Sequence, residues 1–294
     1  MSMVKWDQMA EKFFEGGCSK GMCYTGYDKT SKIYTTGEAW NGVSGFTDNP
    51  SGADEQASYA DNIKYISLRG AENYGGTIKC FWYPDNFRSC LGKKSAVDGV
   101  TVSQQARESF GFAVTTQVGN DVDGTEAGET IHLVWNATTS PSSKDYSSLN
   151  ESPSPSELSF EFTANPVAIG DGTKFKASCN MEICTAGKKE DTTFMGHYEA
   201  LKRILYGADF VTGADSTYFD LAVPTTATEA PANWATDVAA GKYYTESSGT
   251  YTVVASGTTF SAGTAYYSLK NASLPEPQAI IKLFGGSVNT VSEG

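Results

Sequence analysis

The chain has 294 residues, with 22 Lys and Arg against 34 Asp and Glu, which gives a formal net charge of −12. This charge argues against a protein that grips nucleic acid, because such proteins use cationic side chains to displace the counterions of the phosphates. Aromatic residues make up 12% of the chain and there are 30 glycines, a combination typical of pleated, turn-rich structure. We therefore expect a mainly β protein with one main domain and a smaller additional unit.

The N-terminal residues 1–14 include four charged side chains and lack the apolar segment of a signal peptide. No run of about 18 apolar residues occurs, so no membrane-spanning helix is predicted. We expect the protein to be made and kept in the cytoplasm, with its six cysteines as reduced thiols. The absence of a Cys-x-x-Cys pair argues against structural zinc.

The first feature in chain order is a stretch from Trp40 to Asp61 that is rich in Gly, Ser, Asn, Asp and Pro and has almost no periodicity. It predicts a long loop, either functional or a disordered surface excursion, because compact domains rarely leave so long a stretch unused. A strand is predicted at Thr77–Tyr83 and is ended by Pro84. The side chains expected on one face of this strand are Ile78, Cys80 and Trp82.

Two alternating segments, Ser109–Val118 and Thr130–Ala137, predict a hairpin whose turn lies around residues 119–124. Leu158–Thr163 and Thr173–Cys184 alternate in the same way and predict two further strands. The residues expected to share a face within their own strand are Phe110, Phe112 and Val114 in the first, and Ile131, Leu133 and Trp135 in the second.

One helix is predicted at Phe194–Tyr206, where apolar residues recur at helical spacing. Thr192 or Thr193 is expected to cap it and Gly207 to end it. A helix with one apolar stripe must cover something, and the sheet is the available surface. The predicted architecture is a β sandwich or barrel with a flanking helix.

Beyond Pro224 the sequence changes character. Thr225–Pro231 is typical of a linker, and Ala240–Tyr244 is echoed by Ala262–Tyr267. We expect a three-stranded module there, too small to be robust alone. Its aromatic residues are interpreted as its core, the alternative being a sugar-binding patch. They are Trp234, Tyr243, Tyr244, Tyr266 and Tyr267.

Several blocks of the sequence occur in an order that resembles the major tail tube proteins of long, non-contractile-tailed (siphovirus-type) bacteriophages. The similarity covers roughly residues 4–213 and 273–286 and omits the module. The blocks are Lys5-Trp6-Asp7, Gly17–Tyr24, Tyr59–Tyr65, Leu68–Ile78, Phe81–Asp85, Gly111–Gly124, His132–Ala137, Ser140-Pro141-Ser142, Pro166-Val167 and Leu274–Phe284.

This resemblance implies a structural virion protein with a tail-tube-type β sandwich or barrel. Its hexameric rings would stack into the tail tube, and double-stranded DNA would pass through the lumen at ejection without specific binding. The implied partners are further copies of the chain, the tape measure protein and the tail terminator and tip proteins. The implied location is the virion tail after assembly in the host cytoplasm, with no cofactor and no membrane contact.

The predicted loop occupies the position of the family's inter-ring arm. The candidate inter-ring residues are therefore Trp40, Phe46, Asp48, Asn49 and Glu55. Residues 1–224 and 271–294 would form the tail tube domain, and residues 228–270 an inserted module on the tube exterior. The cysteines lie outside the family's pattern and receive no function from it.

No catalytic motif is found in the sequence. The two histidines, His132 and His197, accompany no hydrolase or metal-binding pattern. The Asp121-Val122-Asp123-Gly124 segment predicts a turn rather than a calcium loop, because the essential carboxylates before and after it are missing. We expect no enzyme activity. The alternatives are a carbohydrate-binding or adhesin component of a phage tail, for which the module's aromatic residues would form the binding surface, and a capsid decoration protein.

Overall fold

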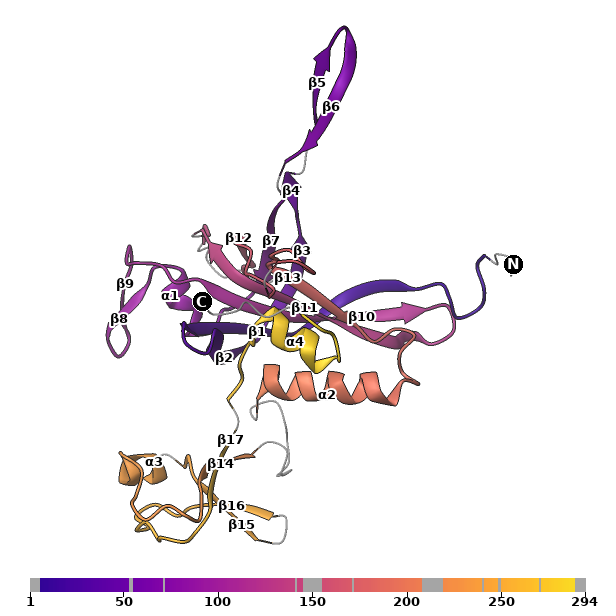
Figure 1. The fold of residues 1–294 in the computed structure, drawn as a ribbon. Helices are drawn as coiled ribbons and strands as arrows, with labels where there is room; N and C mark the ends of the chain where they lie inside the picture. The colour runs from indigo at the N-terminus through magenta and orange to yellow at the C-terminus, as the bar shows by residue number, and fades with distance from the viewer. Residues whose placement is uncertain are drawn as a thin grey trace, which may run out of the picture.

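The computed structural model describes residues 6–52, 55–70, 72–140, 142–144, 155–170, 172–207, 219–239, 241–247, 250–269 and 271–288. The fold is mainly β, as predicted, and its largest part is a nine-stranded sheet (Figure 1). The hydrogen-bonded order is β2-β1-β10-β11-β12-β7-β3, with β13 also paired to β11 and β4 to β7. These strands are β1 (Phe14–Asp28), β2 (Ile33–Trp40), β3 (Val43–Asp48), β4 (Ser51–Gly52), β7 (Glu72–Cys80), β10 (Phe110–Asn120), β11 (Gly124–Thr139), β12 (Leu158–Ala164) and β13 (Asn180–Cys184).

The sheet curls so that β12, β7 and β3 return over β1 and β10 and enclose a first core. β1 and β3 come so close that a Cβ on Gly21 would lie 2.7 Å from the Cγ2 of Val43. Aromatic rings fill the space: the Trp40 ring lies 4.5 Å from that of Phe87 and 5.6 Å from that of Phe112, between centroids. β12 alternates buried and exposed residues along its whole length. Because two layers of strands share one apolar interior, this part of the fold is a sandwich.

The opposite face of the sheet carries a second core beneath α2 (Thr192–Tyr206) and α4 (Pro277–Leu283). Tyr198, Leu201 and Leu205 of α2 are buried there against apolar side chains of the sheet, as the helical stripe predicts. The helix begins earlier than predicted, so the predicted Thr cap is wrong. Asp191 is the last extended residue, and its Oδ1 accepts from the backbone N–H of Phe194 at 3.0 Å.

The hairpin predicted around residues 119–124 is confirmed, because β10 and β11 pair antiparallel on either side of a tight turn. The predicted strand Thr173–Cys184 is wrong in its first half, since only Asn180–Cys184 is strand. In the described part of the chain the residues just before it are held by a bridge between Ser178 and Val167 and by a hydrogen bond from the Trp135 N–H to the Cys179 carbonyl, and Phe175 is exposed. The apolar–polar alternation of the sequence therefore did not suffice to make these residues a strand, because among the described strands they have no continuous partner to pair with.

The predicted strand Thr77–Tyr83 is displaced, because β7 runs from Glu72 to Cys80. Ile78 and Cys80 are buried, as expected, whereas Trp82 lies beyond the strand and is 58% exposed. A one-turn helix, α1 (Phe87–Cys90), and a small hairpin of β8 (Lys94–Val97) and β9 (Val100–Val102) follow.

The long loop predicted from Trp40 to Asp61 is also wrong, because this stretch is mostly strand. β3 and β4 pair with β7, and β5 (Glu55–Ala60) pairs with β6 (Ile63–Arg69). Asp61 and Asn62 both have positive φ, at 50° and 62°, as a two-residue hairpin turn requires. The β5–β6 hairpin, Glu55–Arg69, projects far from the sandwich in Figure 1, and we call it the arm.

Residues 219–269 form a separate four-stranded sheet of order β14-β17-β15-β16, which we call the insert. Its elements are β14 (Phe219–Val223), α3 (Trp234–Ala239), β15 (Tyr244–Ser247), β16 (Thr250–Val253) and β17 (Tyr266–Leu269). The three expected strands are present as β15, β16 and β17, but the predicted boundary at 228 leaves out a fourth strand, β14. Because β14 pairs with β17, the predicted linker Thr225–Pro231 lies inside the unit.

The chain leaves and re-enters the main domain at one point. A Cβ on Gly207, just after α2, would lie 2.4 Å from the backbone nitrogen of Ala272. The N–H of Ser273 donates to the carbonyl of Ile204 at 3.0 Å. The chain thus departs after Gly207 and resumes at Asn271 at neighbouring points of the main domain, which is the geometry of an insertion into an existing fold.

Candidate assembly surface

The five residues proposed for an inter-ring loop do not lie together. Trp40 is buried in the first core, and its Nε1 donates to the carbonyl of Trp82 at 2.8 Å. Phe46 packs against the same core and stacks on Phe162 with centroids 6.2 Å apart. Asp48 and Asn49 are exposed at the end of β3, where the chain leaves the sandwich. Only Glu55 belongs to the arm.

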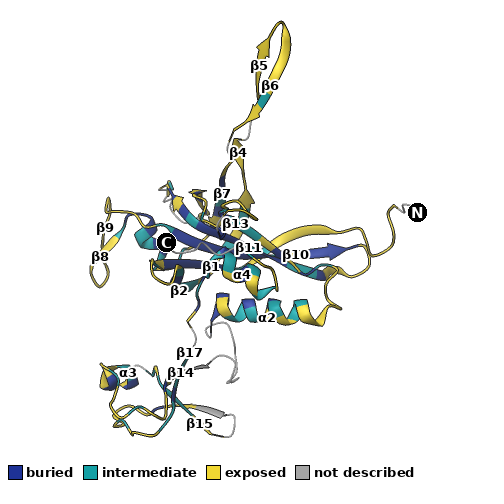
Figure 2. Ribbon diagram, viewed as in Figure 1, coloured by how far each residue is buried: buried dark blue, intermediate teal, exposed yellow. Residues whose placement is uncertain are grey.

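The arm is exposed along nearly its whole length in Figure 2, and it carries large apolar side chains. Tyr59 and Tyr65 are 71% and 75% exposed, and Ile63 and Leu68 are 67% and 60% exposed. Soluble proteins rarely leave such a group of apolar side chains bare unless another molecule covers it. A lone two-stranded hairpin is also only marginally stable in water. The arm therefore has the properties of a contact surface.

The arm has two chemically different faces. Successive residues of a strand point to opposite faces, and the register pairs Ser58 with Ile66 and Ala60 with Ile63. Between Ser58 and Tyr59 the pairing skips one residue of β6, as in a β-bulge, so the alternation of faces along β6 shifts by one residue there. The register therefore places Ile63, Ile66 and Leu68 on one face, which we call the apolar stripe.

The other face of the arm holds an ion pair. The Nζ of Lys64 lies 2.5 Å from the Oε1 of Glu55. The hydrogen bond from Lys64 lowers the pKa of the Glu55 carboxyl. Both partners are solvent-exposed, so the pair contributes little to stability. The pair places charge on this face, which it shares with Tyr59, whereas the apolar stripe carries no charge, so the two faces differ in chemistry.

The sequence contained a signal for the arm that the loop prediction missed. Two runs of strand length are separated by just Asp61 and Asn62, residue types that tolerate the positive φ of a two-residue turn. β5 has the sequence Glu-Gln-Ala-Ser-Tyr-Ala, in which small and polar residues hide the period of two. Pairing with β6, rather than propensity, makes this segment a strand.

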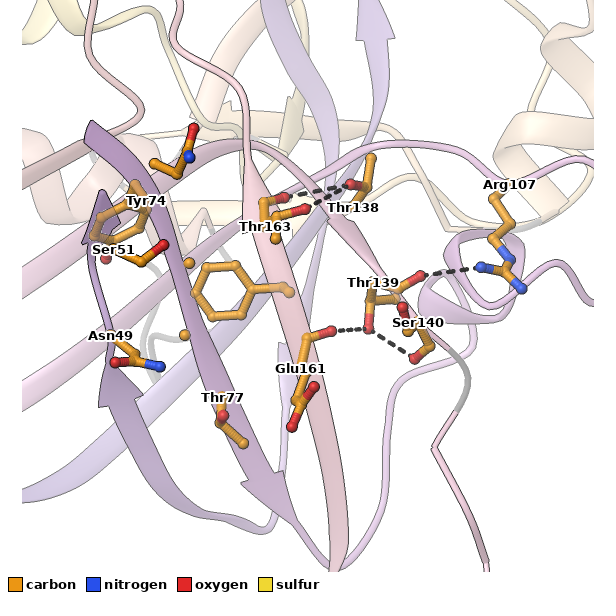
Figure 3. Close-up of a pocket in the computed structure, with 14 residues that line it drawn as sticks. Asn49, Ser51, Tyr74, Thr77, Arg107, Thr138, Thr139, Ser140, Glu161 and Thr163 are labelled. Carbon is orange, nitrogen blue, oxygen red and sulfur yellow. Dashed lines mark hydrogen bonds between the residues drawn. The ribbon is translucent and has the colours of Figure 1, made fainter. Parts of the chain in front are cut away.

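A polar hollow of about 590 Å³ opens beside the point where β4 and β7 leave the sandwich (Figure 3). Its lining includes Asn49, Thr77 and Glu161 together with the aromatic residues Tyr74 and Phe162. The hydroxyl of Thr139 donates to the carbonyl of Glu161 at 2.8 Å, and Arg107 reaches the carbonyl of Thr139 at 3.5 Å. The lining contains neither cysteine nor histidine. The hydroxyl, amide and guanidinium groups of the lining are suited to hydrogen bonding.

A cluster of titratable groups lies next to the base of β3. The Nε2 of His132 lies 2.9 Å from Glu15, and its Nδ1 lies 3.4 Å from Glu182. Burial raises the pKa of Glu15, but hydrogen bonds from Thr116 and His132 outweigh it, and the net pKa is lowered. The cluster joins β1, β11 and β13. The described residues contain no group of three or more His, Cys, Asp or Glu side chains arranged to hold a metal ion.

Neither a family model nor a curated protein matches the sequence. Among solved structures, the chain is similar to a chain of the sheath-tube complex, in the extended state, of PVC, an extracellular contractile injection system. That similarity has 13% sequence identity and a TM-score of 0.25, and it covers 56% of this chain and 88% of the other. None of the helices in the described part of the chain has the length and apolar content that crossing a bilayer requires.

Proposed function

We propose that this protein is a structural subunit of a phage-type tail tube, whose hexameric rings stack into a conduit for double-stranded DNA. The observation that carries the proposal is the arm, a hairpin that reaches out of a complete sandwich and exposes apolar side chains. The two cores of the main domain contain no residue of the arm, so the arm does not contribute to their packing. An arm that contacts the next ring gives these side chains a function.

The charge of the chain supports the same proposal. A net charge of −12 repels phosphate, so DNA can slide past such a wall without binding to it. Under this proposal the protein has no enzyme activity and no cofactor. It occupies the virion tail after assembly in the host cytoplasm, and its partners are its own copies together with tape measure, terminator and tip proteins, as the sequence resemblance implies.

The insert belongs on the outside of the proposed tube. It leaves and returns at neighbouring residues, so the main domain does not depend on it for connection. Trp234 and Tyr266 are buried in its core, and the Trp234 and Tyr243 rings stack with centroids 4.9 Å apart. These aromatic faces are occupied by one another, which weakens the alternative of a sugar-binding surface made from them.

Electron microscopy of the purified full-length protein at increasing concentration tests the proposal. We expect hollow rods with a regular axial repeat. Closed shells, or binding only to the surface of preformed capsids, would support a capsid decoration protein instead. Specific binding on a glycan array by a protein that stays monomeric would support the adhesin alternative.

A further inference from the structure

The structure contains a surface that matches the arm in chemistry. A groove of about 330 Å³ lies between β13, α2 and α4, and we call it the α4 groove. Its walls are mainly apolar and come from Met181, Ile183, Phe194, Ile281 and Phe284, with Cys184 also in the lining. Phe194 and Phe284 form one wall, with ring centroids 5.1 Å apart. The groove is therefore an apolar recess on a molecule that otherwise carries many charges.

One side of the groove is an open sheet edge. β13 pairs with β11 on one side, and the strand order of the described residues places no strand on its other side. The unpaired backbone groups of an edge strand accept an extended segment from a partner. An occupant made of β-strand would satisfy these groups and place alternate side chains into the groove. The arm is such a segment.

We infer that the α4 groove receives the apolar stripe of the arm from a second copy of this chain. This inference rests on the proposed function and names the contact by which copies stack. The stripe is exposed, apolar and extended, and the groove is recessed, apolar and bordered by an open edge. The other exposed apolar hairpin, β8–β9, offers a projecting surface rather than a recess.

The occupant comes from another copy because of where the two surfaces lie. In Figure 1 the arm projects from one side of the main sheet, whereas α2 and α4 cover the other side. A chain cannot therefore place its arm in its own groove. Because the contact joins two different surfaces, each copy keeps a free arm at one end and a free groove at the other. Such a heterologous contact continues along an axis instead of stopping at a dimer.

A disulfide cross-link between the arm and the groove tests the inference in the full-length protein. Cys184 is the exposed member of the six cysteines and lies in the lining of the groove. Of the other five, Cys18 is half-buried and the rest are buried, namely Cys23, Cys80, Cys90 and Cys179. In the variant Ile66→Cys, mild oxidation of assembled protein should give a ladder of covalent oligomers on a non-reducing gel. Adding Cys184→Ser should abolish that ladder.

Ala57→Cys is the matched control, because the register places Ala57 on the opposite face of the arm from Ile66. It should give a much weaker ladder under the same oxidation. A ladder that survives Cys184→Ser, or an equally strong ladder from Ala57→Cys, would overturn the inference.

Micrographs of the same samples separate this inference from the proposed function. Rods without a ladder from Ile66→Cys would refute the arm-in-groove contact and leave the tube proposal standing. A Cys184-dependent ladder from particles that are not rods would support the contact and refute the tube. The absence of both rods and ladder would contradict both.

Discussion

The chain of the first core continues into the arm, yet its apolar side chains are buried in the core and exposed on the arm. Phe46 and Ile78, on β3 and β7, pack within the body. Farther out, Tyr59, Ile63 and Tyr65 lie in solvent. Apolar side chains that are buried in the monomer stabilise its fold, whereas those on the arm add almost nothing to it. The contrast indicates that stability and assembly depend on different residues and can be separated by mutation.

The largest predicted effect on the folded monomer comes from the first core. Phe112→Ala should lower the free energy of unfolding by about 3–5 kcal/mol, because it removes a buried ring and leaves a cavity. Ile66→Ala on the arm should change it by less than about 0.5 kcal/mol. Urea denaturation of dilute, unassembled protein measures both. Similar losses for the two variants would show that the arm is part of the cooperative fold.

A smaller effect is expected at Glu129, which lies 3.5 Å from Lys20 and 3.4 Å from Lys202. Burial raises the pKa of this carboxyl, but attraction to the two ammonium groups outweighs it, and the net pKa is lowered. A lowered carboxyl pKa stabilises the fold above the unfolded value of about 4.3 and loses that contribution as the pH falls through the folded value. Glu129→Gln should therefore lower the free energy of unfolding by about 1–2 kcal/mol at pH 7.

This difference between wild type and Glu129→Gln should shrink as the pH falls through the lowered pKa of Glu129, where the wild-type carboxyl also becomes neutral. Unfolding curves collected from pH 7 to pH 3 measure it. Glu126→Gln, at an exposed carboxyl on the same strand, serves as the control and should leave stability unchanged. A difference that stays constant with pH would mean that the loss has no electrostatic origin.

The cap of α2 should have a more modest effect. Asp191→Ala removes the acceptor of the Phe194 N–H and should cost about 1 kcal/mol. Glu190→Ala, at the exposed neighbouring residue, is the matched control and should have little effect. Thermal unfolding followed by circular dichroism compares the two. Equal effects would mean that the capping bond contributes nothing.

The insert should contribute least to the body. Deleting residues 208–270 and joining Gly207 to Asn271 links points that are already adjacent. The free energy of unfolding of the main domain should then change by less than about 0.5 kcal/mol. A larger loss would show that the insert supports the sandwich. A variant that folds but makes no rods would place the insert within the assembly contacts and would contradict an exterior position.

The sequence predicted those elements whose side chains alternate between a core and solvent. β12 and the β10–β11 hairpin were found because large apolar residues follow the pleat. The arm was missed because its strands are exposed on both sides, so no burial pattern marks them. β14 was missed because its partner, β17, is distant in sequence and only their pairing defines the insert.

The candidate site was predictable in position but not in its residues. The loop prediction placed contact residues between Trp40 and Asp61, and the arm overlaps that range only through β5. A deletion of residues 44–57, which the loop prediction suggests, would remove β3 and the Phe46 ring from the first core. The structure instead shows Gly52 and Glu72 directly paired beneath the arm. The arm is therefore best deleted between Gly52 and Glu72.

The most direct test of the account is assembly without the arm. Replacing residues 53–71 by Asn-Gly closes β4 and β7 with a two-residue hairpin turn and keeps the sandwich intact. The triple variant Ile63→Ser, Ile66→Ser, Leu68→Ser keeps the hairpin but removes the apolar stripe and serves as a second test of the same contact. Sedimentation velocity and electron microscopy should show hollow rods for the wild type and only separate rings or monomers for both variants, with unchanged circular dichroism spectra. Rods of wild-type length from the armless protein would contradict the central claim.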